Sequence, residues 1–99
     1  MKTLIYEPDP ERAQGHVARL REGSSLVEVA RSVAEARVKL LNNHYDRLAL
    51  RRGTGAVHAL LGVARATSPA CMMVDLGSMR SRPLGGPNLD AEAALSPAE

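Results

Sequence analysis

The chain has 99 residues, with 13 basic and 11 acidic side chains that give a formal net charge of +2. This length fits a single domain, and 44% hydrophobic with 24% charged residues argue against disorder of the whole chain. Eleven of the basic residues are arginine, but the net charge is weak and only two residues are aromatic. Nucleic-acid surfaces usually combine a concentrated basic stripe with aromatic side chains, so the composition disfavours a nucleic-acid partner.

The core has to be built without Phe or Trp, since the chain contains neither. Aliphatic side chains bury less area per residue than aromatic rings, and a short chain buries a modest share of its surface. We therefore expect modest stability and a tendency to associate. The single cysteine, Cys71, excludes an intramolecular disulfide, and no Cys/His cluster indicates zinc.

The beginning of the chain carries no apolar segment of the kind that directs secretion. The short run Leu4–Tyr6 is followed at once by Glu7 and Pro8, whereas a signal peptide needs a longer apolar stretch. No run approaches the length that spans a membrane. The expected location is the cytoplasm.

The first third of the chain reads as strand, helix and strand. Leu4–Tyr6 is a short apolar run typical of a buried strand, and Asp9 with Pro10 forms an expected helix start. Gly23 is the expected end of that helix, and the β-branched segment 26–30 predicts a second strand. The apolar face of the first helix is expected to consist of Ala13, Val17 and Leu20.

A second helix and a third strand are expected next. Ser32 is a candidate N-cap, Glu35 lies in the first turn where the helix dipole favours an acid, and the helix should end near residues 42–43. Segment 47–51 is apolar at its centre and predicts a strand. Helical spacing relates the apolar residues Ala34, Val38, Leu41 and Tyr45, which are the expected core face of this helix.

The remaining pattern predicts a third helix and a fourth strand, followed by a change in composition. Glycines at 53 and 55 interrupt the pattern before a helix that runs to about Ser68, and segment 70–74 has no polar residue. We assign residues 1–76 to the folded domain and 77–99 to a flexible tail rich in Pro and Gly, with one short helix at 91–95. The core face of the third helix is expected to comprise Val57, Leu60, Leu61 and Ala64.

Alternating strands and helices with short connections predict an α/β fold with three layers, α/β/α, and a four-stranded parallel sheet with about three helices. The right-handed crossover rule places helices on both faces of the sheet. The spacing alone leaves two topologies open, a flavodoxin-like strand order and half of a Rossmann unit.

Three segments, 4–10, 32–36 and 46–51, carry a resemblance to a known family. Their order and distances resemble those of a bacterial response-regulator receiver domain, over roughly residues 2–76. In that family the segments correspond to an acidic motif after the first strand, a Glu-Ala motif opening the second helix, and a third strand ending in the phosphoacceptor Asp. The resemblance implies the flavodoxin-like order and a role in two-component signal transduction.

The chain departs from the receiver pattern at most of the residues that serve phosphoryl transfer. Arg51 stands at the phosphoacceptor position, and a guanidinium stays protonated and cannot act as the nucleophile. Of the acidic pair Glu7 remains, but Pro8 supplies no metal ligand and Asp9 is one residue away. The resemblance therefore implies a degenerate, truncated receiver, or pseudo-receiver. Such a module would bind proteins without catalysis, cofactor or metal.

The expected phosphoryl site also lacks its other polar groups. The usual hydroxyl at the end of the fourth strand falls at Val74 or Asp75, and the usual fifth strand with its Lys has no counterpart. In this topology the first and third strands are neighbours. We therefore predict that Arg51 pairs with Glu7 or Asp9 and neutralises the acidic corner, the alternative being a solvated strand end.

A competing hypothesis is a small nucleotide- or anion-binding protein, with or without enzymatic activity. Arg52, Gly53 and Gly55 lie between a strand and a helix, where a phosphate-binding loop would lie. The dinucleotide pattern is incomplete because His58 replaces its third glycine, and no Lys-Ser/Thr pair completes a P-loop. A tight turn is the simpler reading, with His58 as a surface histidine.

The fourth strand is expected to lie at the edge of the sheet, since no fifth strand is recognisable. An apolar edge invites pairing with another chain. A homodimer is the simplest expectation, and a sensor kinase or an output regulator is the alternative partner that the resemblance implies. Leucines 84, 89 and 95 of the tail are an alternative cover. The residues predicted to form the interface are Cys71, Met72, Met73 and Val74.

Overall fold

The computed structural model describes residues 1–23, 25–51 and 55–83. Strands and helices alternate along most of these residues, and two consecutive strands end the described part. The elements are β1 (Lys2–Tyr6), α1 (Pro10–Arg21), β2 (Leu26–Ala30), α2 (Val33–Asn42), β3 (Arg47–Leu50), α3 (Ala56–Thr67), β4 (Met72–Asp75) and β5 (Ser81–Pro83).

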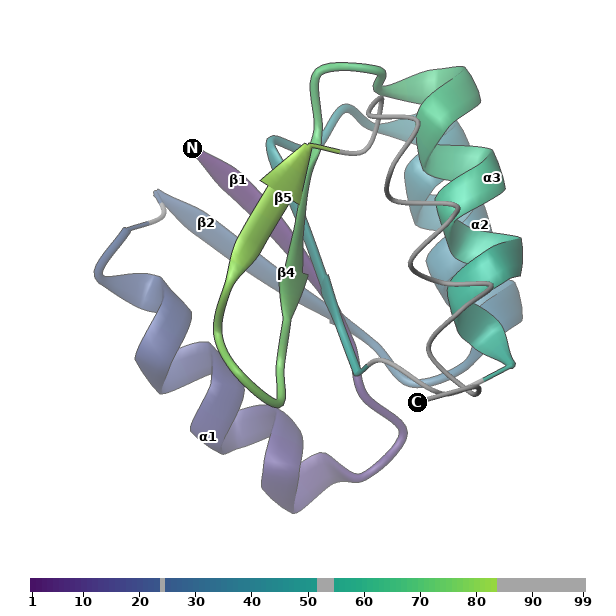
Figure 1. Cartoon of the computed structure of the whole chain (residues 1–99). Helices are drawn as coiled ribbons and strands as arrows, with labels where there is room; N and C mark the ends of the chain where they lie inside the picture. Colours follow the sequence, from purple (N-terminus) through teal and green to yellow (C-terminus); the bar gives the residue numbers. More distant parts are fainter. Residues whose placement is uncertain (24, 52–54, 84–99) are drawn as a thin grey trace, which may run out of the picture.

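The strands form one sheet in the order β2-β1-β3-β4-β5. The first four run parallel, and β5 is antiparallel to β4. Figure 1 shows α1 on one face of the sheet and α2 with α3 on the other. Each helix connects two parallel strands, so crossovers to both faces produce the three layers. The predicted α/β/α architecture with a flavodoxin-like arrangement is confirmed.

The prediction that β4 forms the sheet edge is wrong. Ser81 pairs with Val74 and Arg82 with Met73, so the short β5 covers the side of β4 that faces away from β3. A three-residue strand containing proline gives almost no periodic signal, which is why the sequence predicted four strands rather than five. The assigned domain boundary after residue 76 therefore falls within a β-hairpin. The predicted helix at 91–95 lies outside the described residues.

The predicted helix starts are confirmed by side-chain caps. The Asp9 carboxylate accepts a hydrogen bond from the backbone N–H of Glu11 at 3.0 Å, and Pro10 is the first residue of α1. At α2, the Ser32 hydroxyl accepts from the backbone N–H of Glu35 at 3.1 Å. The Glu35 carboxylate in turn accepts from the backbone N–H of Arg31 at 2.9 Å, which completes a capping box.

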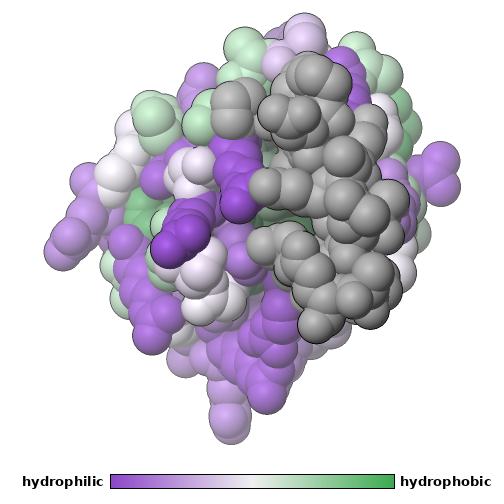
Figure 2. Space-filling model, viewed as in Figure 1, coloured by the Kyte–Doolittle hydropathy of each residue, from purple (hydrophilic) through white to green (hydrophobic). Residues whose placement is uncertain are grey.

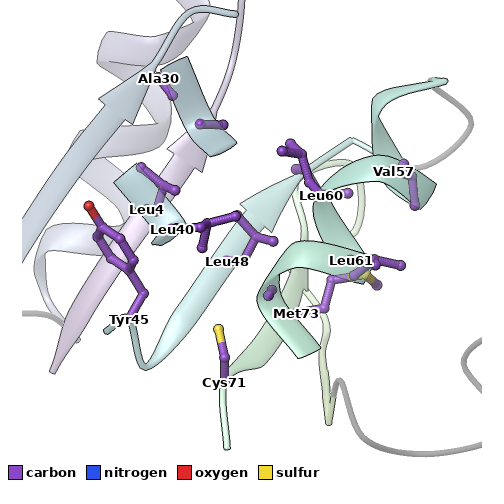
Figure 3. Close-up of a cluster of buried hydrophobic side chains, with 13 residues drawn as sticks. Leu4, Ala30, Leu40, Tyr45, Leu48, Val57, Leu60, Leu61, Cys71 and Met73 are labelled. Carbon is purple, nitrogen blue, oxygen red and sulfur yellow. The ribbon is translucent and has the colours of Figure 1, made fainter. Parts of the chain in front are cut away.

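The core has two parts, one on each face of the sheet. Beneath α2 and α3, Leu4 and Leu48 of the sheet meet Leu40, Leu60 and Leu61 of the helices (Figure 3). The only aromatic residue buried there is Tyr45. The smaller cluster on the α1 face consists of Ile5, Leu20, Ala49, Val74 and Leu76.

The face of α2 that packs on the sheet differs from the expected one. Ala36 and Leu40 are fully buried, whereas Val38 is 57% exposed and Leu41 is 61% exposed. The helix carries apolar residues on more than one side, so helical spacing alone selects the wrong side. Of the four residues expected on the core face, Ala34, Val38 and Leu41 are therefore exposed, whereas Tyr45, beyond the end of α2, is buried.

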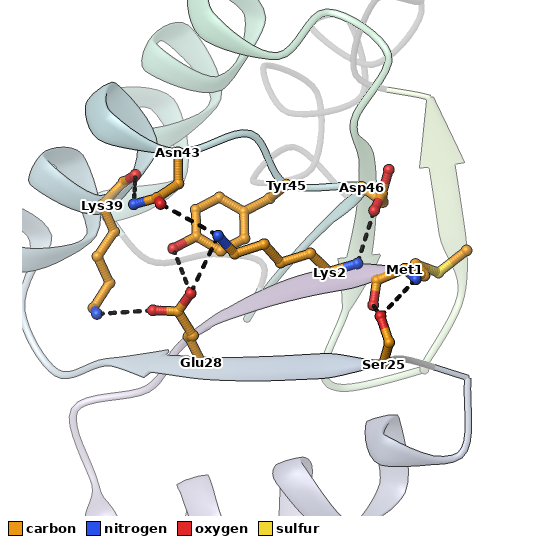
Figure 4. A network of polar contacts seen from close by, with 8 residues as sticks. All are labelled: Met1, Lys2, Ser25, Glu28, Lys39, Asn43, Tyr45 and Asp46. Atoms are coloured by element: carbon orange, nitrogen blue, oxygen red, sulfur yellow. Dashed lines mark hydrogen bonds and ion pairs between the residues drawn. The ribbon is translucent and has the colours of Figure 1, made fainter.

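A polar network joins the edge strand β2 to α2 and β1 (Figure 4). The Glu28 carboxylate accepts hydrogen bonds from Lys39 Nζ at 3.1 Å and from the Tyr45 hydroxyl at 3.2 Å, and Lys2 Nζ lies 3.5 Å away. Lys2 also lies 4.8 Å from the centre of the Tyr45 ring. Burial favours the neutral form of Glu28, but Lys39, Tyr45 and Lys2 outweigh it and hold the Glu28 pKa below its ordinary value. Burial and the Glu28 charge together raise the pKa of Tyr45.

Replacing Glu28 with glutamine should destabilise the fold in a pH-dependent way. Because the folded state lowers the Glu28 pKa, its contribution is complete above the ordinary value of 4.5 and is lost as the pH falls through the folded-state value. Glu28→Gln should cost about 1 kcal/mol at neutral pH, and its difference in stability from the native chain should shrink as the pH falls below the ordinary Glu pKa and through the lowered folded-state value. Urea unfolding of both proteins over this pH range measures the difference in their free energies of unfolding. Glu22→Gln, at an exposed residue, is the control and should have little effect on stability. A stability loss in Glu28→Gln that does not change with pH would contradict the prediction.

Candidate functional site

The candidate site lies where the carboxyl ends of β1 and β3 meet. The sheet pairs Ile5 with Ala49, so Glu7 and Arg51, each two residues further along, emerge at the same edge. The strand order changes direction here, since β2 lies on one side of β1 and β3 on the other. In open α/β sheets such a switch point is where ligands and catalytic groups usually lie.

The centre of the site is a buried carboxylate. The Glu7 side chain is 7% exposed, and its Oε1 lies 3.2 Å from Arg51 Nη2 and 3.1 Å from His16 Nε2. Glu7 Oε2 accepts a hydrogen bond from the backbone N–H of Asp9 at 3.3 Å. Three elements therefore meet at this carboxylate: Glu7 follows β1, His16 comes from α1 and Arg51 follows β3. These three residues are called the Glu7 cluster below.

His16 is the member of the Glu7 cluster that sequence analysis missed. It is buried on α1, and its Nδ1 has no hydrogen-bond partner among the described residues. The Nε2 contact with the Glu7 carboxylate is best made by an N–H donor, because a carboxylate oxygen accepts hydrogen bonds. Its place in the sequence could have indicated this role. His16 comes three residues after Ala13 and four before Leu20, so its ring lies on the inward face of the helix.

The predicted pairing of Arg51 with Glu7 is confirmed. Asp9, the other predicted partner, instead caps α1 and lies 3.7 Å from Arg12 Nε. The Arg51 side chain is 42% exposed, so one side of the guanidinium contacts the buried carboxylate and the rest remains accessible. The corner therefore contains its own cation, placed against the carboxylate that the receiver resemblance associates with metal binding.

A shallow pocket of about 300 Å³ opens at this corner. Its charged side chains form two opposite-charge pairs, Glu7 with Arg51 and Asp9 with Arg12. The described residues contain no group of three or more His, Cys, Asp or Glu side chains arranged to hold a metal ion. The residues that line the pocket are Tyr6, Glu7, Pro8, Asp9, Arg12 and Arg51.

The candidate anion-binding loop can be placed only at its end. Arg52 and Gly53 lie outside the described residues. Gly55 is the N-cap of α3, where it supplies no side-chain hydrogen bond, and a Cβ atom there would meet nothing within 4 Å. His58 is exposed on α3, as expected.

The residues predicted to form an interface lie inside the fold. Met73 belongs to the core under α2 and α3, Val74 belongs to the cluster under α1, and Met72 is half-buried. Cys71 is buried, and burial with the nearby charge of Asp46 raises its pKa to about 12, so the thiol stays protonated. Together with the β5 pairing, this removes the premise that β4 presents an open edge.

Comparison of the chain with protein-family models, curated proteins and solved structures found no match. The fold and the Glu7 cluster are therefore the observations on which function has to be argued. None of the helices in the described ranges is both long and apolar enough to cross a membrane.

The Glu7–Arg51 contact should be measurable as a coupling energy. Arg51→Met should destabilise the chain by about 1–2 kcal/mol, because it removes a charged hydrogen-bond donor from a buried carboxylate. In the Glu7→Gln background the same substitution should cost less. A double-mutant cycle in urea isolates the pair from other contacts of Arg51. If the stability losses of the two single variants add up to the loss of the double variant within about 0.3 kcal/mol, the contact does not contribute to stability.

Proposed function

We propose that the chain is a receiver-like regulatory module that acts by binding another protein and is not controlled by phosphorylation. The observation that carries this proposal is the ion pair between Arg51 and the buried Glu7 carboxylate. It lies at the carboxyl edge of β1 and β3, where the resemblance to receivers expects a phosphoacceptor carboxylate and a metal-binding acid. The strand order 2-1-3-4-5 supports the resemblance at the level of topology.

The chemistry of the corner argues against phosphoryl transfer. The reaction needs a carboxylate nucleophile, oxygen ligands for a divalent cation and groups that stabilise the transferred phosphoryl. Arg51 supplies a permanent cation instead of the nucleophile, and Pro8 supplies no ligand atom. At the end of β4, the Asp75 carboxylate accepts hydrogen bonds from the Gly77 N–H at 3.0 Å and the Ser78 hydroxyl at 3.1 Å. That carboxylate is therefore engaged in the hairpin turn.

The resemblance also gives the expected class of partner. A receiver-like module without phosphoryl chemistry retains its helix faces for binding, and a sensor kinase or an output regulator is the partner that this reading favours. Affinity capture of the full chain from its native cell tests the reading directly. Recovery of either class of protein supports it, whereas a co-purified nucleotide would favour the anion-binding alternative.

Phosphoryl donors should leave the protein unmodified. With Mg²⁺ and acetyl phosphate, intact mass spectrometry should show no increase of about 80 Da. Beryllofluoride with Mg²⁺ should likewise leave the amide NMR spectrum unchanged, because both carboxylates of the corner are already engaged, Glu7 with Arg51 and His16, and Asp9 with the α1 cap and Arg12. A functional receiver treated in parallel provides the positive control. A Mg²⁺-dependent adduct mapped to Glu7 or Asp9 would refute the proposal.

Arg51→Asp should convert the neutralised corner into a repulsive one. It would place a second carboxylate beside buried Glu7, and the expected loss is about 1–3 kcal/mol at neutral pH. Millimolar Mg²⁺ should restore part of this stability by linkage, with no effect on the native chain. Thermal unfolding with and without Mg²⁺ measures both effects. Equal Mg²⁺ responses of variant and native chain would contradict the role assigned to Arg51.

A further inference from the structure

The outer side of β2 is an unpaired edge of the sheet. Among the described residues β2 pairs only with β1, and Figure 1 shows no strand beyond it. The Ala30 carbonyl accepts a hydrogen bond from the Glu7 N–H at 3.0 Å, so the polar backbone groups of Ala30 point towards β1. Backbone groups alternate in direction along an edge strand. The N–H and C=O groups of Val27 and Val29 therefore point outwards, where a further strand could bind them.

Local contacts close this open edge at both ends. The next outward N–H, that of Arg31, donates to the Glu35 carboxylate at 2.9 Å in the capping box. At the other end, the Ser25 N–H donates to the Met1 carbonyl at 2.8 Å. The open edge is therefore confined to the two valines between these contacts. The three-residue β5 shows that a strand this short can pair in this sheet.

A shallow groove of about 440 Å³ lies beside Val29 on the α1 face of the sheet. Ala13 and Val17 of α1 contribute apolar side chains to it, and Arg31 also lines it. In Figure 2 the side of α1 is mainly hydrophilic, in contrast to this groove. Residues directly opposite each other in an antiparallel pair share a face of the sheet. A strand added to β2 would therefore direct the side chain opposite Val29 into the groove.

Two charged residues line the groove, and only one of them is engaged within the described ranges. The Glu35 carboxylate accepts the backbone N–H of Arg31. The Arg31 guanidinium is exposed and has no hydrogen bond or ion pair among the described residues. Arg31 lies two residues beyond Val29, so it would face a position two residues away from the one that enters the groove. An acidic side chain at that position would complement its charge.

We propose that the edge of β2 binds an extended segment of another protein that runs antiparallel to β2 and carries an acidic residue two positions before an apolar one. The apolar side chain enters the groove opposite Val29, and the acidic side chain faces Arg31. In an antiparallel pair, the residues opposite Val27 and Val29 exchange both backbone hydrogen bonds, so a three-residue segment satisfies all four outward groups. A parallel partner would need about five residues. The backbone bonds supply affinity, and the groove with Arg31 supplies specificity.

A second copy of the chain fits this edge poorly. Glu28 points from β2 towards α2 and Tyr45 (Figure 4). If β2 paired with itself so that Val27 lay opposite Val29, Glu28 would lie directly opposite Glu28 of the partner subunit. Like charges in that position are destabilising. Ser25 of the partner subunit would then face Arg31 in place of an acid. The charge pattern therefore favours another polypeptide as the occupant.

This inference deepens the proposed function by naming a binding surface and the chemistry of its partner, and it rests on that function only for the regulatory role of the binding. The chemistry of the Glu7 cluster takes no part in it.

Amide NMR titration of the full chain with a synthetic peptide is the first test. The probe is an acetylated and amidated octapeptide of threonine, with aspartate third, leucine fifth and valine seventh. It should produce saturable shifts of the Val27 and Val29 amides, with a dissociation constant below about 1 mM. N-methylation of the leucine should abolish binding, because its N–H donates to the Val29 carbonyl. Replacing the leucine with threonine should weaken binding about tenfold.

A second comparison tests Arg31. The native chain should bind the aspartate peptide about threefold more tightly than the same peptide with asparagine in that place. Arg31→Gln should lose this preference. It should keep its thermal stability, because the backbone N–H that completes the capping box remains. Arg37→Gln, at another exposed arginine, is the matched control and should retain the preference.

Three results would overturn the inference. One is the absence of saturable shifts of the β2 amides up to about 5 mM peptide, and another is binding that N-methylation leaves unchanged. The third is a shift of the same amides with protein concentration alone, which would identify a second copy as the occupant. Equal affinity of the native chain for the aspartate and asparagine peptides would overturn the role of Arg31.

These failures are distinguishable from failure of the proposed function. Loss of peptide binding at β2 would leave the phosphorylation test unaffected. A phosphoryl adduct would refute the proposed function and leave peptide binding at β2 standing.

Discussion

Glu7 is buried at the carboxyl end of β1, and a buried carboxylate needs hydrogen-bond donors or positive charge to offset its lost hydration. Arg51 and His16 provide the side-chain contacts, from the segment after β3 and from α1. The carboxylate thereby holds α1 and two central strands in register at one edge of the sheet. The same contacts occupy the position where the fold would present a reactive group.

The α1 face of the sheet is covered by one helix and by the turn between β4 and β5. Leu76 and Met79 of this turn pack with Ile5, Ala49 and Val74. Met79 adopts φ 60°, a left-handed conformation that costs a non-glycine residue about 1 kcal/mol. The turn thus brings additional apolar side chains to a face with one helix, in a chain without Phe or Trp.

The opposite face shows why a local pattern can mislead. Both sides of α2 are apolar, and the side with Ala36 and Leu40 is the one that joins the core shared by the sheet and α3. Val38 and Leu41 on the other side consequently remain exposed.

The sequence by itself determined the order of the helices and the first four strands, and it determined the caps at Asp9 and Ser32. These features depend on periodicity and on contacts within a few residues, which are local. The sequence also indicated that Arg51 pairs with an acid of the segment after β1, because adjacent parallel strands end at a common edge of the sheet. Only the tertiary structure decided that His16 reaches Glu7, which side of α2 is buried, and that Ser81–Pro83 completes the sheet. Those outcomes depend on how elements far apart in the chain pack together, and no local pattern encodes that choice.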